Sequence, residues 1–439
     1  MIINKVEIDK LFGRFDYVIP LENENNHISI LTAPNGYGKS TILKIIHSFA
    51  SGDYYYFIRE RFERIRFFLS TNEVVEVIRS EEDVINNQVT FRYNGLLSKI
   101  KDPFGGDESD NGRSFVIEQY LPFLTRTGLR SWRHDRTGEI FNATEILSRY
   151  GDHPAIRRKI KQDEWLSNIK KQLSVFSIPT NRLKSEEDFD PRGHHSSKTN
   201  LMVSKLAKDI QEKMQSAIIN QFEEGRKKET SFPTRLIESL SDNISPSRES
   251  VIASIHSVQK YEERYGRLGL VPHTETTKQL NVHAASTENA GMLVLKTYLD
   301  DILEKFSILE NLAQKLDIFC SSINELLAFK TVETSADDGI IIKVIDGLKE
   351  PIPLSVLSSG EQHLIVLIGK LVFDTNKNTL VLIDEPEISF HPEWQEKFLD
   401  ILEKIRKLND FNVLVATHSP ILIGERWDGV IELAEQHHI

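Results

Sequence analysis

Residues 33–41, which read Ala-Pro-Asn-Gly-Tyr-Gly-Lys-Ser-Thr, constrain the fold of this chain more than any other segment. They match the phosphate-binding pattern G-x-x-x-x-G-K-[ST], except that Ala33 stands where the first glycine usually does. An apolar strand is expected before the turn at residues 28–31, and helical apolar spacing follows it at residues 41–49. Small residues allow backbone N–H groups to surround a phosphate at the start of a helix. We therefore expect an α/β fold whose nucleotide-binding residues are Asn35, Gly36, Gly38, Lys39, Ser40 and Thr41, with the Ser40 hydroxyl also a ligand of Mg²⁺.

A second motif is the apolar run at residues 380–383, which ends in Asp384 and Glu385. A buried parallel strand has this composition, and it would bring both carboxylates to the edge of a sheet. There Asp384 can hold the shell of a magnesium ion, and Glu385 can polarise an attacking water as general base. A strand that ends in a solvated acidic turn would give the same pattern. The phosphate-binding turn in the same chain favours the functional interpretation.

A third motif, Leu-Ser-Ser-Gly-Glu-Gln at residues 357–362, precedes a helix that we expect to begin near His363. Ser358, Ser359 and Gly360 could bind a phosphate there through exposed N–H groups and the helix dipole. A plain helix cap, with Ser359 as the N-cap and Gln362 completing a capping box, explains the same residues. The local sequence does not separate the two interpretations.

A histidine, His418, follows the apolar run at residues 412–416, which we expect to form another buried strand. At a strand end this histidine could contact a γ-phosphate or orient a water molecule. An isolated histidine in this position is more often structural. The three motifs described above favour a catalytic role for it.

The order of these motifs resembles that of ABC-type ATPases of the SMC-like branch, in which long insertions separate the two halves of the site. The resemblance covers residues 28–48 and 354–419. It implies an enzyme that hydrolyses ATP with Mg²⁺, with Glu385 and His418 as catalytic residues. Two protomers would enclose two ATP molecules, so that Lys39 and Ser40 of one protomer face Ser358, Ser359 and Gly360 of the other.

The signature and the Q-loop depart from the usual pattern of that family. Ser359 replaces the more usual glycine of the L-S-G-G-Q signature and Glu361 replaces its glutamine, which suits SMC-like members more than transporters. The Q-loop is predicted at residues 180–182, Thr-Asn-Arg, where no glutamine is present.

Within this branch, residues 384–392, Asp-Glu-Pro-Glu-Ile-Ser-Phe-His-Pro, are similar to ATPases of bacterial anti-phage systems. These include the overcoming-lysogenization-defect nucleases, the Septu ATPase PtuA and the PARIS ATPase AriA. The first family carries a Toprim nuclease domain after the ATPase, whereas only a short tail follows His418 here. The resemblance therefore implies a stand-alone ATPase in anti-phage defence. It would act as a sensor and scaffold for a separate effector, such as a Toprim or HNH nuclease.

The predicted architecture is an α/β ABC-type ATPase head with a mixed sheet, interrupted by a helical or short coiled-coil insertion. Residues 1–183 would form the N-terminal part of the head, residues 184–329 the insertion, and residues 330–439 the C-terminal part. The insertion carries an apolar seam with steps of four and three from Ile302 to Leu327. This seam could pack inside one protomer or form a coil between subunits, and both interpretations stay open.

The segment from about residue 119 to residue 172 is predicted to be helical and locally basic. It could bind DNA, RNA or an acidic protein, with Trp132 available for stacking. A solvated helix face balanced by nearby acidic residues explains the same pattern. The net charge of −11 argues against a globally basic nucleic-acid binder. The basic residues are Arg126, Arg130, Arg133, Arg136, Arg157, Arg158, Lys159, Lys161, Lys170 and Lys171.

Composition excludes several other classes of protein. The single cysteine, Cys320, rules out an intrachain disulfide and a thiolate zinc cluster. No apolar run approaches the roughly 20 residues of a membrane-spanning helix. The first residues lack the pattern of a signal peptide, so a cytoplasmic location without membrane attachment is expected.

The alternative function is a DNA-repair or chromosome-maintenance ATPase of the same branch that binds DNA. Such a protein should have long coiled coils and often a C-x-x-C zinc hook. This chain has one cysteine and only about four to five heptads of seam. A transporter ATPase subunit would require a signature nearer the phosphate-binding turn and a glutamine Q-loop, and neither is evident.

Overall fold

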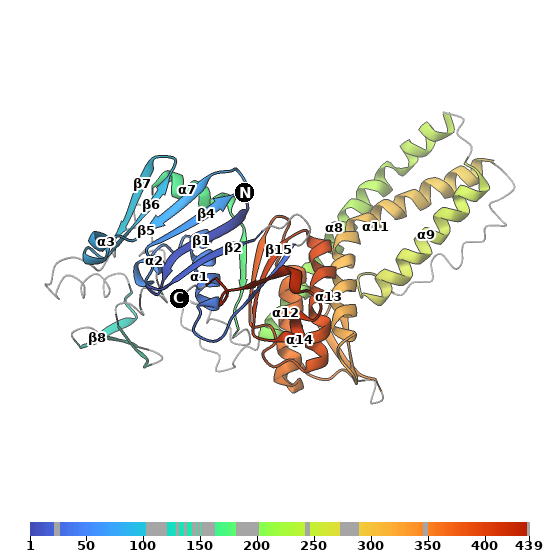
Figure 1. The fold of residues 1–439 in the computed structure, drawn as a ribbon. Coiled ribbons are helices and arrows are strands. Elements are labelled where there is room, and N and C mark those ends of the chain that lie inside the picture. Colours follow the sequence, from blue (N-terminus) through green and yellow to red (C-terminus); the bar gives the residue numbers. More distant parts are fainter. Residues whose placement is uncertain are drawn as a thin grey trace. The chain divides into compact units, whose positions relative to one another are not determined.

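The computed structural model divides the chain into two compact units. Unit 1 contains residues 1–180, 375–388 and 409–439, and unit 2 contains residues 181–374 and 389–408. Figure 1 shows the elements of both units coloured along the sequence. The predicted division into a head and an insertion at residues 184–329 stays a prediction. The structure describes residues 1–21, 27–101, 121–128, 131–135, 138–142, 146, 150, 163–180, 202–241, 246–272, 289–345 and 350–436.

Unit 1 contains a five-stranded parallel sheet in the order β11-β14-β15-β3-β16. All its neighbouring strands pair in parallel, so their carboxyl ends share one edge. The α/β prediction is confirmed, as are the predicted strands at residues 28–31, 380–383 and 412–416, which are buried as their continuous apolar sequences require. The strands are β3 (Ile28–Thr32), β11 (Val175–Ile178), β14 (Leu380–Asp384), β15 (Asn412–Thr417) and β16 (Val430–Glu432).

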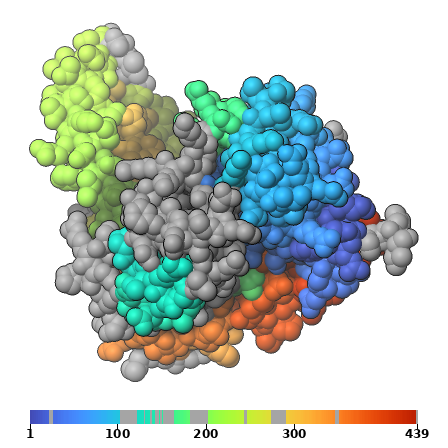
Figure 2. Space-filling model, turned by 90° about the vertical axis from the view of Figure 1, so that its left-hand side faces the viewer, coloured from blue at the N-terminus to red at the C-terminus, as the bar shows by residue number. Residues whose placement is uncertain are grey.

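A six-stranded antiparallel sheet also belongs to unit 1, in the order β2-β1-β4-β5-β6-β7. Helix α3 (Glu81–Ile85) joins β5 to β6 and begins at a capping box made by Ser80 and Asp83. The segment from α3 to β7, light blue in Figure 2, lies at the surface, although most of β6 is buried. The strands are β1 (Ile3–Leu11), β2 (Phe15–Pro20), β4 (Arg64–Leu69), β5 (Val74–Ile78), β6 (Gln88–Tyr93) and β7 (Leu96–Lys101).

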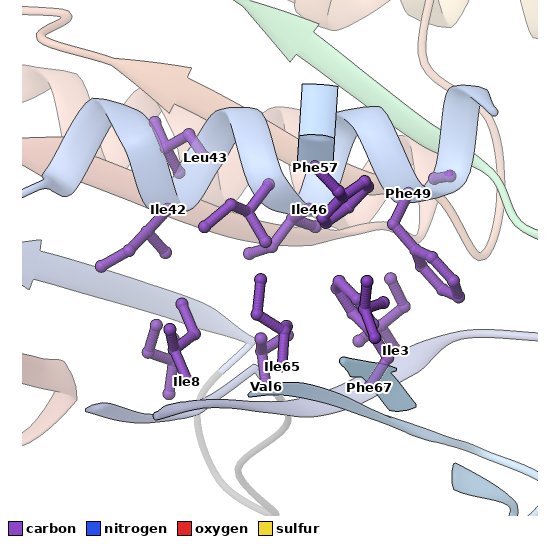
Figure 3. Close-up of a cluster of buried hydrophobic side chains, with 14 of the residues drawn as sticks. Ile3, Val6, Ile8, Ile42, Leu43, Ile46, Phe49, Phe57, Ile65 and Phe67 are labelled. Carbon is purple, nitrogen blue, oxygen red and sulfur yellow. The ribbon is translucent and has the colours of Figure 1, made fainter. Parts of the chain in front are cut away.

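Helix α1 (Lys39–Ser51) is at the centre of the core of unit 1. One side of α1 contacts β11, β14 and helix α7 (Glu164–Gln172). On the other side, Ile42, Ile46 and Phe49 point toward β1 and β4 (Figure 3). The Phe49 ring stacks on Phe67 of β4 with ring centroids 3.9 Å apart, and both rings are buried. This packing, with short helix α2 (Tyr56–Arg59) beside it, fixes the helix that begins at the glycine-rich turn.

The helical prediction for residues 119–172 is wrong for its first part. A three-stranded antiparallel sheet forms there from β8 (Leu124–Gly128), β9 (Ser131–His134) and β10 (Ile140–Asn142). Trp132 and His134 are buried while Arg133 between them is exposed. That alternation has the period of two of a strand, so the side chains of this segment divide between two faces. Among the described residues of this segment, α7 agrees with the prediction, and Ile146 and Tyr150 are also helical.

The described part of unit 2 is built on the long helices α8 (Met202–Ser241), α9 (Arg248–Arg267) and α11 (Asn289–Asn324). Helix α11 contacts both α8 and α9, as Figure 1 also shows. Along the predicted seam, Phe306, Leu309 and Leu316 are buried. The seam therefore packs within the chain, which is one of the two interpretations that the sequence leaves open.

The rest of unit 2 surrounds helix α12 (Ser359–Phe373), which is almost entirely buried. It contacts α8 and α11. Strands β12 (Lys330–Ser335) and β13 (Gly339–Val344) form a hairpin, and the turn η1 (Leu354–Val356) leads into α12. Helix α13 (Pro392–Asn409) belongs to unit 2 up to Leu408. In unit 1, helix α14 (Pro420–Ile423) and the turn η2 (Trp427–Gly429) lead from β15 to β16. Within the described ranges, no helix combines the length and apolarity needed to cross a membrane.

Candidate functional site

The glycine-rich turn connects β3 to α1 at the carboxyl edge of the parallel sheet. Gly36 and Gly38 have φ angles of 90° and 88°, a conformation that residues with a side chain rarely adopt. A Cβ atom on Gly38 would also lie 3.0 Å from the Phe12 ring. Asn35 and Gly36 are exposed and Thr41 is half-buried in the first turn of α1. The turn thus has the conformation that phosphate binding requires, and its tip faces solvent.

The side chain of Lys39 is buried at the base of this turn, with the residue 6% exposed. Its Nζ atom donates a hydrogen bond to the carbonyl of Ala33 at 2.8 Å and lies 2.5 Å from Nε2 of His418. Burial lowers the pKa of the Lys39 ammonium, and the nearby carboxylates of Glu385 and Asp384 oppose that effect. The Lys39 ammonium has therefore lost most of its hydration, and a bound anion would stabilise its charged form.

The carboxylate of Asp384, at the end of β14, accepts hydrogen bonds from two hydroxyl groups. Ser40 donates to Oδ1 at 3.1 Å and Thr180 donates to Oδ2 at 3.2 Å. The predicted pair of metal ligands, Ser40 and Asp384, is therefore brought together. Thr180 is the first residue of the predicted Q-loop, and the other two residues of that prediction lie outside the described residues.

The backbone at Glu385 has a left-handed conformation with φ of 46°. Its N–H donates to the carbonyl of Ala416 on β15 at 2.9 Å, which ties the turn after β14 to the neighbouring strand. One carboxylate oxygen of Glu385 lies 3.8 Å from Nε2 of His418. The two predicted catalytic side chains therefore lie side by side.

Two more carboxylates at this edge are absent from the sequence-based prediction. Glu387 accepts hydrogen bonds from the Thr417 hydroxyl and the His418 N–H. Glu432, in β16, accepts a hydrogen bond from the hydroxyl of Thr32, just before the glycine-rich turn. The Asp-Glu-Pro-Glu run could have indicated the first of these. The second lies in a three-residue strand with no motif, so only the fold reveals it.

The site therefore gathers a buried cation, a hydroxyl–carboxylate pair and a carboxylate–imidazole pair where three adjacent strands end. Among the described residues, no group of three or more His, Cys, Asp and Glu side chains could hold a metal ion. The pair formed by Ser40 and Asp384 suits Mg²⁺ instead, because that ion is commonly held by one or two protein oxygens together with phosphates and waters. The donor set is thus consistent with a magnesium–nucleotide complex.

Comparison with known families agrees with this geometry. Residues 160–424, more than half of the chain, match the family described as "AAA domain, putative AbiEii toxin, Type IV TA system". The chain belongs to this family. In this AAA-domain protein, β15 lies between the strand of the glycine-rich turn and the strand of Asp384. The glycine-rich turn after β3 and the carboxylates at the end of β14 thus lie at the carboxyl edge of one parallel sheet, the strand–turn–helix arrangement of an α/β P-loop fold.

Individual relatives are distant. The AAA-domain protein is 29% identical over 126 residues to protein ea59 of Escherichia phage lambda, which covers 28% of this chain and 24% of that protein. It is 26% identical over 132 residues to the lipoprotein-releasing system ATP-binding protein LolD of Ehrlichia ruminantium, which covers 30% of this chain and 53% of LolD. The chain thus spans about a quarter and about half of these two relatives.

Solved structures of Smc head domains resemble the chain along almost its whole length. The head from Pyrococcus furiosus, bound to the C-terminal domain of ScpA, is 14% identical, with a TM-score of 0.40 over 98% of this chain and 93% of that one. The head from Thermotoga maritima is 11% identical, with a TM-score of 0.39 over 98% and 94%.

The predicted signature turn of this AAA-domain protein lies in unit 2. Helix α12 begins at Ser359, four residues earlier than predicted, because Gly360 is accommodated inside the first turn. The N-cap is Ser358 rather than Ser359, and Glu361 rather than Gln362 completes the capping box. Ser358 and Ser359 are exposed.

The carboxylate of Glu361 is the most strongly bonded group of this turn. It accepts hydrogen bonds from Lys330 at 2.7 and 2.9 Å and from the Ser358 backbone N–H at 2.8 Å. Burial alone would raise the pKa of Glu361, but Lys330 and Ser358 outweigh burial and hold the pKa below its ordinary value. The residue that replaces the usual glutamine is therefore paired with a cation.

Two residues of the predicted basic region, Trp132 and Arg126, are less available for binding a nucleic acid than the sequence indicates. Trp132, predicted to be available for stacking, is 2% exposed. Arg126 donates a hydrogen bond to the carbonyl of Gly128 at 2.9 Å, on its own strand. The prediction that Trp132 is available for stacking is therefore wrong. The basic residues Arg130, Arg136, Arg157, Arg158, Lys159 and Lys161 lie outside the described residues.

Proposed function

We propose that this AAA-domain protein binds ATP at the glycine-rich turn and hydrolyses it. The observation that supports this most is the buried Lys39 ammonium. It lies beside His418 and within the electrostatic reach of Asp384 and Glu385. A cation, a metal-binding pair and a water-polarising carboxylate are the parts that phosphoryl transfer to water requires.

Each side chain then has a definite task. Lys39 neutralises charge on the β- and γ-phosphates, and Ser40 and Asp384 would hold Mg²⁺. When bound there, Mg²⁺ would supply positive charge that stabilises the negative charge on the phosphate oxygens. Glu385 takes a proton from the attacking water, and His418 orients that water or contacts the γ-phosphate.

The test compares two lysines of helix α1. Lys39 is buried, whereas Lys44 is exposed in the next turn of the same helix. Lys39→Ala should weaken binding of a fluorescent ATP analogue at least about tenfold and abolish turnover, while Lys44→Ala should change neither. Equal binding by the two variants would contradict the assignment of the phosphate site.

The active unit is proposed to be a dimer in which Ser358, Ser359 and Gly360 of one subunit contact the nucleotide held by Lys39 of the other. The support is the resemblance in motif order, together with the exposed serines that begin α12. A helix N-terminus of this kind can bind a γ-phosphate through its N–H groups and dipole.

Mixed subunits test the dimer. Lys39→Ala and Ser359→Arg should each be inactive alone. In a mixed dimer, the Ser359→Arg chain supplies Lys39 and the Lys39→Ala chain supplies the signature turn, so one composite site is intact. Partial ATPase activity should return on mixing. A protein that hydrolyses ATP fully as a monomer, by light scattering with ATP and Mg²⁺, would contradict the proposal.

The biological role is proposed to be the control of a toxic effector in anti-phage defence. Two observations support it: residues 384–392 resemble defence ATPases, and the family description names a toxin of a type IV toxin–antitoxin system. The effector would be a separate protein, such as a Toprim or HNH nuclease encoded nearby. Cells that express this protein together with its neighbouring genes should give fewer phage plaques than cells without them. The Lys39→Ala variant should restore the number of plaques.

A further inference from the structure

The carboxylate of Glu387 lies at the site but has no role in the proposed function. It lies two residues beyond Glu385, in the turn that follows β14. The N–H of Ile388 donates to the carbonyl of Glu385 at 3.2 Å and closes this turn. The N–H of Glu385 is bonded to Ala416. The turn is therefore anchored to β15, and the Glu387 side chain reaches the end of that strand.

The Glu387 carboxylate contacts Thr417, the last residue of β15, and His418, which follows the strand. Its Oε1 atom accepts hydrogen bonds from the Thr417 hydroxyl at 2.7 Å and from the backbone N–H of His418 at 2.8 Å. The same Thr417 hydroxyl oxygen accepts from the N–H of Ser419 at 2.9 Å. Thr417 is fully buried. One oxygen of Glu387 thus holds the Thr417 side chain and the His418 backbone directly, and the Thr417 hydroxyl in turn holds the backbone N–H of Ser419.

The His418 ring needs such an anchor. Its side chain is 35% exposed and the strand ends immediately before it. The ring contacts Lys39 and lies near Glu385, which are groups whose alignment decides turnover. Hydrogen bonds to a carboxylate are shorter and stronger than those to a neutral oxygen, so Glu387 is well suited to hold this backbone.

We propose that Glu387 is a positioning residue, which holds the Thr417 side chain and the His418 backbone and thereby keeps the His418 ring at Lys39 and Glu385. This inference rests on the proposed ATPase function. Glu387 touches no reacting atom in it and acts through His418. The other carboxylate oxygen, Oε2, is buried and bonds to no described residue. The clamp therefore uses one oxygen, which an amide could also supply.

That last point gives the test. Glu387→Gln keeps an oxygen able to accept both hydrogen bonds, whereas Glu387→Ala removes it. Glu387→Ala should lower kcat roughly ten- to a hundredfold with little change in KM, and Glu387→Gln should retain at least about half of the wild-type kcat. The exposed Glu425, replaced by Ala, is the matched control and should not change kcat. Equal losses in Glu387→Ala and Glu387→Gln, or no loss in Glu387→Ala, would overturn the proposal.

A double mutant separates positioning from general stabilisation of the fold. If Glu387 acts through His418, Glu387→Ala should cost no further rate in a His418→Ala background. If Glu387→Ala lowers the rate by the same factor in both backgrounds, the proposal is overturned, because a purely structural role does not depend on the imidazole.

A readout without turnover keeps this test distinct from that of the proposed function. Hydrogen–deuterium exchange at the His418 amide should be faster in Glu387→Ala and unchanged in Glu387→Gln and Glu425→Ala. Unchanged exchange in Glu387→Ala would overturn the clamp, whether or not the chain hydrolyses ATP. Wild-type turnover that does not depend on Lys39 would instead reject the proposed function.

Discussion

The Nζ atom of Lys39 lies 2.5 Å from Nε2 of His418, although the two residues are 379 positions apart in the sequence. Strands β3 and β15 are parallel neighbours with Thr32 opposite Thr417, so the residues that follow these strands meet at one sheet edge. An ammonium donates hydrogen bonds and cannot accept them, so the imidazole accepts here. A phosphate bound at the turn would compete with His418 for the same cation, and we expect the ring to shift when nucleotide binds.

Glu385→Gln should separate ATP binding from hydrolysis. The amide keeps the size of the side chain but cannot take a proton from water, so kcat should fall about 10²-fold or more. Nucleotide affinity should stay within about threefold of the wild type, since Glu385 is not a phosphate ligand. Single-turnover kinetics with equilibrium binding checks both parts. Full turnover in the variant would assign the base to another residue.

Ser40→Ala should raise the Mg²⁺ concentration needed for half-maximal turnover. The substitution removes one of the two protein oxygens proposed to hold the ion and leaves Asp384 in place, so a shift of roughly tenfold is expected. Turnover measured against Mg²⁺ at fixed ATP checks this, and a chelator should abolish activity in both proteins. Thr71→Ala, an exposed hydroxyl of unit 1 bonded to Glu73, should leave the curve unchanged. The same Mg²⁺ requirement in wild type and Ser40→Ala would argue against this metal pair.

Acid should weaken the contact between α9 and α11 through Glu310. Burial alone would raise its pKa, but hydrogen bonds from Arg264, Tyr265 and Gln314 outweigh burial and hold the folded-state pKa below 4.5. A depressed pKa stabilises the fold above the unfolded-state pKa, and this contribution is lost as the pH falls through the folded-state pKa. The melting temperature of the wild type should therefore fall below about pH 4.5 more steeply than that of Glu310→Gln.

The control for this experiment is Glu304, whose pair with Lys228 is at the surface. At pH 7, Glu310→Gln should cost about 1–3 kcal/mol because it leaves Arg264 short of an acceptor. Glu304→Gln should cost less than about 1 kcal/mol. Parallel pH profiles for wild type and Glu310→Gln would show that this ion pair does not contribute.

The single cysteine should be unreactive in the folded protein. Burial raises the pKa of the Cys320 thiol to about 12, and a hydrogen bond with Thr334 offsets this only in part. At pH 8 the thiolate fraction would be about one in 10⁴, against about a quarter for an ordinary thiol. Alkylation with iodoacetamide, followed by mass spectrometry, should be slow in buffer and fast in guanidinium. Labelling of the native protein at the rate of a free thiol would contradict this.

The central strands and the nucleotide motifs were accessible from the sequence because their signals are local. Residues 380–383 and 413–416 are continuous apolar runs, a composition typical of strands buried on both faces. Lys39, Asp384 and Glu385 stand next to such strands, so the position of each at the sheet edge follows from parallel pairing. Nothing in the sequence indicated that Glu432 would join them, because its position depends on which strands become neighbours. Thr180 was predicted as part of the Q-loop, but its hydrogen bond to Asp384 depends on the pairing of β11 with β14.

Two local errors have physical reasons. Around Trp132, Arg126 is half-buried and Arg133 is exposed on short strands, and the number of basic residues in the sequence hid the alternation of buried and exposed positions. The helix expected to begin near His363 begins at Ser359 and includes Gly360. The Gly360 backbone is helical, and a Cβ atom there would lie 2.7 Å from the carbonyl oxygen of Ser389, so close packing explains the glycine.

The order of the strands also determines when the parallel sheet can be completed during synthesis of the chain. β3 leaves the ribosome long before its neighbours in the sheet, β15 and β16. With 379 positions between Lys39 and His418 and translation at about 5–20 residues per second, roughly 20 to 80 seconds pass between them. Throughout that interval the strand before the glycine-rich turn has two unpaired edges, and a nascent chain in this state is a natural client for chaperones.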